Sequence, residues 1–280
     1  MQPVKALEPG AMFWIGRETL AELQSLGLRC GQLGVAGGVD LSDTVAAQWK
    51  KDLEAAQFTL STVVAAYDGE DYADIPTVQR TVGFIPRATR AAREERTYAV
   101  SDFGARLGVK SIATHIGFVP EDAADPDYVA VRGLVRRVCD HAAANGQSFA
   151  LETGQERANV LLHFIQDVDR ENLKINFDPA NMILYGTGDP IEALRTLAPK
   201  VVSVHCKDGD WPPKAIAGAL GTERPLGQGS VGIERFVKTL AEVGYRGQLN
   251  IEREGTSHEG WLHDVGEAAR LLERITGSMA

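Results

Sequence analysis

Three features are scarce in this sequence, and each absence narrows the class of protein. No run of about 18 apolar residues occurs, so no membrane-spanning helix is expected. The three cysteines, Cys30, Cys139 and Cys206, form no CxxC pair, which favours free thiols over a disulfide framework. Basic residues are outnumbered, with 29 Lys and Arg against 38 Asp and Glu, so an extended nucleic-acid partner is not expected. Residues 1–10 lack the apolar segment of a secretory signal, so a cytoplasmic location is expected.

Short apolar, β-rich runs alternate with longer amphipathic runs along the whole chain. This alternation predicts parallel strands joined by helical crossovers. Eight such pairs predict a single-domain α/β protein over residues 1–280, with a (β/α)8 TIM-barrel fold. An open doubly wound sheet is the alternative, but the early GxGxxG motif typical of many such sheets is absent. The expected strands are 12–15, 30–35, 58–65, 111–116, 148–152, 174–178, 201–205 and 248–252. The expected helices are 17–26, 44–56, 90–107, 128–144, 156–169, 191–197, 233–243 and 258–275.

Two of the connections that follow strands are long, at residues 67–87 and 208–232. Loops of more than about 12–15 residues in a compact domain are usually functional or disordered. In a barrel, both connections would lie over the face where active sites are built. They are candidates for a lid, with a mobile surface excursion as the alternative.

The strongest chemical signal is a polar residue at the C-terminal end of each of the last four expected strands. These residues are Glu152, Asp178, His205 and Glu252. Because these strand ends meet at one face of a barrel, three carboxylates would converge there and would require a compensating cation. Carboxylate oxygens with one imidazole suit Mn²⁺, Mg²⁺, Co²⁺ or Zn²⁺, and we predict one divalent ion with Mn²⁺ as first choice. Taken singly, the aspartate is as well explained as a helix cap, and the histidine as a satisfied buried residue.

Six further residues near the same rim are predicted to contact substrate, namely Trp14, His115, Gln155, Asn181, Lys207 and Asp208. His115 ends another expected strand, and a second metal site or a structural role are the alternatives. Asn181 follows Asp178 by one helical turn, so both can face the same pocket. Asp208 is equally explained as the cap of a turn, and Glu156 as an acid at a helix N-terminus.

At these strands the sequence resembles the sugar phosphate isomerase/epimerase family of the xylose isomerase-like TIM-barrel superfamily, which is AP endonuclease family 2-like. The resemblance is carried by Thr-His115-Ile-Gly, Leu-Glu152-Thr-Gly, Asn-Phe-Asp178-Pro-Ala-Asn181, Val-His205-Cys-Lys-Asp208, Pro-Leu-Gly-Gln-Gly and Ile-Glu252-Arg-Glu. It implies that Glu152, Asp178, His205 and Glu252 bind one divalent ion, commonly Mn²⁺. It also implies that the two glutamates flank the substrate and exchange its proton.

The function implied by this resemblance is a metal-dependent sugar epimerase or isomerase. Glu152 and Glu252 would transfer a proton through a metal-stabilised enediolate. A keto-inositol or keto-sugar dehydratase and an inactive sugar-binding barrel are the alternatives. The expected partner is a small carbohydrate, with neither nucleic acid nor membrane, and barrels of this kind are commonly homo-oligomers. Asn181 stands where sugar epimerases often have histidine, and Gln155-Glu156 where Asn-Arg is frequent, so specificity is expected to differ.

Overall fold

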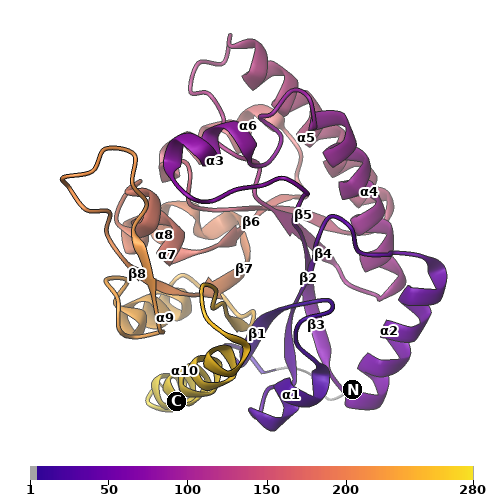
Figure 1. The fold of residues 1–280 in the computed structure, drawn as a ribbon, viewed down its shortest axis with the longest axis vertical. Helices are drawn as coiled ribbons and strands as arrows, with labels where there is room; N and C mark the ends of the chain where they lie inside the picture. The colour runs from indigo at the N-terminus through magenta and orange to yellow at the C-terminus, as the bar shows by residue number, and fades with distance from the viewer. Residues whose placement is uncertain (1–4, 280) are drawn as a thin grey trace.

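The protein is described here by a computed structural model that covers residues 5–279. Eight parallel strands close into a barrel, and helices surround it (Figure 1). Around the barrel the order is β1 (Pro9–Trp14), β10 (Leu249–Ile251), β7 (Val201–Cys206), β6 (Leu173–Phe177), β5 (Ser148–Glu152), β4 (Ser111–Thr114), β3 (Thr59–Ala65) and β2 (Cys30–Val35). This arrangement confirms the predicted (β/α)8 TIM barrel.

The helices follow the strands much as the periodicity predicts. They are α1 (Leu20–Ser25), α2 (Asp43–Ala56), α3 (Ile75–Thr81), α4 (Arg90–Arg106), α5 (Pro126–Ala144), α6 (Ala158–Val168), α7 (Pro179–Tyr185), α8 (Pro190–Leu197), the 3-10 helix η1 (Ala198–Lys200), α9 (Ile233–Glu242) and α10 (His258–Gly277). No helix within residues 5–279 combines the length and apolarity needed to cross a membrane.

The differences from the prediction include two additional helices and the start of one strand. Neither α3 nor α7 was expected, because each has only seven residues, too few for a helical period to stand out. Strand β1 begins at Pro9, earlier than expected, because a proline without an N–H is tolerated at the first residue of a strand.

The core lies between the barrel and its helices. Large side chains such as Phe13, Phe149 and Phe177 are completely buried there. The cysteines are buried free thiols, as predicted, and burial raises the pKa of Cys30 and Cys139 to about 12. Such thiols remain protonated and unreactive near neutral pH.

The two long connections contain structure that the sequence did not predict. The first holds α3, and the second forms an antiparallel hairpin of β8 (Asp208–Asp210) and β9 (Thr222–Arg224), drawn in orange in Figure 1. The two connections are joined to each other, because Ile75 N–H donates to the carbonyl of Gly218 at 2.9 Å. They therefore form a linked cover beside the barrel mouth instead of two independent loops.

Candidate metal centre

Four consecutive strands of the barrel each deliver one ligand-type side chain to the same end. Glu152 is the last residue of β5, and His205 is the last but one of β7. Asp178 and Glu252 directly follow β6 and β10. The structure brings these four predicted residues together, with one potential ligand atom of each lying within 4.8 Å of the others. Their side chains are only 0–9% exposed.

His205 lies at the centre of the cluster, and its two ring nitrogens face different surroundings. Nε2 lies 2.7 Å from the acceptor Gln32 Oε1, closer than the 3.1 Å to Asn176 Nδ2, and can donate to Gln32. Nδ1 lies 2.9 Å from Glu252 Oε2 and 3.1 Å from Glu152 Oε1. It also lies 3.5 Å from Asp178 Oδ2. Burial lowers the pKa of His205, but the charges of Glu252 and Glu152 raise it well above its usual value. The three carboxylates therefore call for positive charge beside Nδ1.

The two carboxylate oxygens of Asp178 have different surroundings, and one of them is open to a cation. Its Oδ1 accepts the backbone N–H of Asn181 at 2.9 Å and so caps α7. Its Oδ2 is buried and has no hydrogen-bond partner among the described residues. A buried carboxylate oxygen without a hydrogen bond is costly, and coordination to a cation removes that cost. One aspartate thus serves both as helix cap and as candidate ligand, and the donor set of three carboxylates and one imidazole suits a divalent ion.

A cavity of about 310 Å³ opens above the cluster. Glu152 and Glu252 line its charged side, together with predicted contacts His115, Asn181 and Lys207. The opposite wall is apolar and is formed by Met12, Trp14, Val64, Ala65 and Ala66. Trp14 can occupy this wall because residue 34 is glycine; a Cβ there would lie 2.5 Å from atoms of the indole.

His115 and Gln155 act as a pair beside Glu152. Gln155 Nε2 lies 3.2 Å from His115 Nδ1. His115 Nε2 lies 3.3 Å from Glu152 Oε1 and can donate to it. Burial lowers the pKa of His115, but the Glu152 carboxylate outweighs burial and raises the pKa to about 9. His115 reaches the cavity directly, whereas Gln155 orients it from behind.

Lys207 and Asp208 are neighbours with different surroundings. Lys207 Nζ lies 3.1 Å from Glu252 Oε2 and 3.0 Å from Glu254 Oε2, inside the cavity. The Asp208 carboxylate does not line the cavity. It accepts four backbone N–H groups, those of Gly209, Gly227, Gly229 and Val231. Its geometry is that of a turn cap that shapes the 208–232 connection, the alternative weighed for it from the sequence.

The interpretation of Glu156 as a helix-terminal acid is wrong. Helix α6 starts after Arg157, which makes no side-chain cap, and Glu156 precedes it. Glu156 is 9% exposed, and its carboxylate accepts the N–H of Val119 at 3.0 Å. Burial raises its pKa to about 7. The residue ties the segment after β4 to the segment after β5.

Sequence reasoning missed several residues that line the cavity, namely Met12, Val64, Glu70, Tyr72, Tyr185 and Glu254. Glu254 had a usable signal, because it follows Glu252 by two residues. Tyr72 and Glu70 come from the long connection after β3, and Tyr185 from the unpredicted α7, where no periodic pattern exists.

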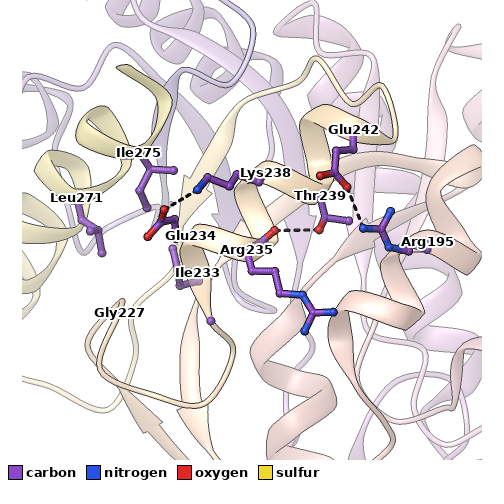
Figure 2. Close-up of a pocket in the computed structure, with 11 residues that line it drawn as sticks. Arg195, Gly227, Ile233, Glu234, Arg235, Lys238, Thr239, Glu242, Leu271 and Ile275 are labelled. Atoms are coloured by element: carbon purple, nitrogen blue, oxygen red, sulfur yellow. Dashed lines mark hydrogen bonds and ion pairs between the residues drawn. The ribbon is translucent and has the colours of Figure 1, made fainter. Parts of the chain in front are cut away.

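A larger hollow of about 740 Å³ lies elsewhere, along the outer side of α9, and Figure 2 shows its lining. Its charged side chains are paired, Lys238 with Glu234 at 2.6 Å and Arg195 with Glu242 at 2.8 Å. None of its lining residues in the described part of the chain is a predicted site residue. Volume alone therefore does not locate the candidate site, whereas convergent chemistry does.

Comparison with known proteins gives a family match over almost the whole chain. A family model described as "Xylose isomerase-like TIM barrel" matches residues 20–275. A crystal structure of a xylose isomerase domain protein from Planctomyces limnophilus is 42% identical. It has a TM-score of 0.89, and the match covers 97% of each chain.

More distant structures share the fold. A xylose isomerase-like TIM barrel protein from Mycobacterium smegmatis in complex with magnesium is 18% identical, with a TM-score of 0.68, over 92% of this chain and 87% of that chain. D-allulose 3-epimerase from Methylomonas sp. in complex with D-allulose is 16% identical, with a TM-score of 0.70, over 97% and 98%. Uncharacterized protein YihM of Escherichia coli K12 is 35% identical over 65 residues, which are 23% of this chain and 20% of that protein.

Proposed function

Because the chain belongs to the xylose isomerase-like TIM barrel family, we propose that it is a metal-dependent epimerase or isomerase of a sugar or sugar derivative. The observation that carries the proposal is the buried cluster at the floor of the cavity. There, three carboxylates surround Nδ1 of His205, and Oδ2 of Asp178 has no hydrogen-bond partner among the described residues.

Glu152, Asp178, His205 and Glu252 would hold one divalent ion. When bound, such an ion stabilises negative charge that develops on substrate oxygens. Mn²⁺ remains the first choice because oxygen ligands dominate the set. The magnesium in the relative from Mycobacterium smegmatis supports the class of ion.

In this proposal, two glutamates would move a proton at the substrate carbon next to its carbonyl group. Glu152 and Glu252 both line the cavity, and their strands are separated by β6 and β7. Each has a hydrogen-bond donor beside it, His115 at 3.3 Å from Glu152 and Lys207 at 3.1 Å from Glu252. One carboxylate removes the proton from one face of the substrate, and the other returns a proton to the opposite face, which inverts the carbon.

The remaining side chains would orient a hydroxylated substrate. His115 Nε2–H, Asn181 Nδ2 and Lys207 Nζ present donors to hydroxyl or carbonyl oxygens. The wall at Met12 and Trp14 would contact the C–H face of a sugar ring. The D-allulose complex of the Methylomonas epimerase supports a sugar of this size as the ligand class.

The test is a metal analysis of the purified protein followed by a deuterium-exchange screen in ²H₂O over ketoses, keto-inositols and 3-keto-glycosides. We expect bound divalent metal and exchange at the carbon next to the carbonyl. Glu152→Gln and Glu252→Gln should each reduce exchange by about 10²–10⁴-fold. Glu242→Gln, on the outer side of α9, removes the same charge away from the cavity and should leave exchange unchanged.

Three outcomes would contradict the proposal. Absence of bound metal, together with full activity of Glu152→Gln, would rule out this centre as the site of reaction. Loss of water with a new enone absorbance would identify a dehydratase. Sugar binding without any deuterium exchange would identify an inactive binding barrel.

A further inference from the structure

A second hollow of about 490 Å³ adjoins the metal cavity. The two share Trp14 and Glu254 as a common boundary. The second hollow is formed by the segment after β1, which includes Arg17, and by residues 253–258 after β10. Both segments follow the C-terminal ends of their strands, so the two hollows lie side by side at the same face of the barrel.

Most charged groups around the second hollow are already paired. Arg253 lies 2.7 Å from Asp264 and 3.1 Å from Glu223. His258 lies 2.9 Å from Glu22. These cations therefore contribute little net positive charge to a ligand in the hollow.

Two side chains at the boundary, those of Arg17 and Glu254, can still form hydrogen bonds with a ligand. Arg17 is exposed, makes no ion pair with any residue in 5–279, and lies with its guanidinium carbon 5.5 Å from the Trp14 ring centroid. Glu254 binds Lys207 through Oε2, and its side chain is 54% exposed. The boundary therefore offers an indole, guanidinium N–H donors and a carboxylate acceptor, while Thr256 adds a hydroxyl.

This mixture suits a polyhydroxylated ring better than a phosphate. Hydroxyl groups can donate to Glu254 and accept from Arg17, and the indole can pack against C–H groups. A phosphate would find one unpaired arginine and be repelled by the adjacent carboxylate. The metal cavity, at about 310 Å³, lies at the lower end of the range of ligand pockets, about 300–1,000 Å³, so a two-ring substrate requires the adjoining hollow.

We propose that the second hollow is a subsite for a sugar unit attached glycosidically to the unit held at the metal. The substrate class is then a glycosylated keto sugar, not a free monosaccharide. This inference rests on the proposed function for the chemistry at the metal, but the binding of the second ring can be measured separately.

The test compares four probes by calorimetry on the metal-loaded protein, namely fructose, lactulose, isomaltulose and fructose 6-phosphate. In lactulose and isomaltulose a hexose is attached to fructose at O4 and O6. We expect at least one disaccharide to bind about tenfold or more tightly than fructose. Thr256→Trp, which fills the hollow, and Arg17→Ala should remove this gain and leave fructose affinity unchanged within about twofold. Arg235→Ala, in the outer hollow of Figure 2, is the matched control and should keep the gain.

Equal affinity for fructose and both disaccharides, or a gain seen with fructose 6-phosphate alone, would overturn the subsite. A gain that Thr256→Trp leaves intact would overturn it as well. Deuterium exchange measured on the same samples separates the two proposals. A disaccharide gain without exchange contradicts the proposed reaction and supports the subsite, whereas exchange on fructose without any gain contradicts the subsite alone.

Discussion

The mouth of this barrel has two unlike sides. The side built on β5, β6, β7 and β10 carries four buried ligand-type residues, and each has a specific polar neighbour. The side built on β1 and β3 presents Met12, Trp14 and Val64. The charged side tolerates little change because each carboxylate needs its partner in a dry environment. The apolar side needs only the right shape, so we expect it to define which substrate fits.

The largest expected effect is the loss of one charge on the charged side. Asp178→Asn keeps an Oδ1 that can cap α7 but removes the carboxylate charge. We expect loss of bound metal and a fall in deuterium exchange of about 10³-fold or more, with little change in the unfolding temperature of the metal-free protein. Metal analysis and thermal unfolding check this. If Asp178→Asn retained bound metal and activity, the negative charge of Asp178 would not be required, which would contradict the prediction.

A second prediction tests whether the two sides are independent. Gln32 lies on β2, outside the charged side, yet its Oε1 lies within hydrogen-bond distance of His205 Nε2, at 2.7 Å. Gln32→Leu should weaken metal affinity by about 10–100-fold, because the imidazole loses the group that fixes its tautomer. Titration against a chelating dye measures this. Gln147→Leu, which removes another buried glutamine hydrogen-bonded to Ser101, should lower stability without changing metal affinity.

A third prediction concerns Glu156, a buried acid near the charged side that makes no ion pair with any residue in 5–279. Its pKa rises from 4.5 unfolded to about 7 folded, so between these values the folded state holds a proton that the unfolded chain has released. Stability is therefore lost as pH rises through this window, by about 3 kcal/mol. Glu156→Gln should stabilise the protein by this amount at pH 8 and make no difference at pH 4.5. Urea unfolding at both pH values decides, and a pH-independent difference would contradict the prediction.

The smallest expected effect lies on the apolar side. Trp14→Leu shortens the wall without touching any of the four candidate ligands. We expect KM to rise about tenfold, about 1.4 kcal/mol of binding energy, with metal affinity unchanged. Steady-state kinetics with metal titration measures both quantities. A change in metal affinity would show that the apolar wall also supports the centre.

The prediction from sequence was strongest for the polar residues that end apolar strands, because each can be recognised within a single strand. Each of Glu152, Asp178, His205 and Glu252 interrupts the end of an apolar run, and parallel strands bring such ends to one rim. Prediction was weakest in the connections. Nothing periodic indicates that Tyr72 reaches the cavity or that Ile75 meets Gly218, because these contacts join segments far apart in the chain.

The sequence by itself determined the barrel and the four residues at its mouth. Hydrophobic periodicity and polar residues at strand ends are local patterns, so they can be recognised in the sequence before the fold is known. Only the tertiary structure decided which neighbour each polar side chain meets. In the structure the Asp208 carboxylate accepts four backbone N–H groups, and Lys207 contacts Glu252 and Glu254. Glu156 is buried, and its carboxylate accepts the N–H of Val119. The physical reason is that hydrogen bonding and burial depend on distances across the barrel, which sequence spacing does not contain.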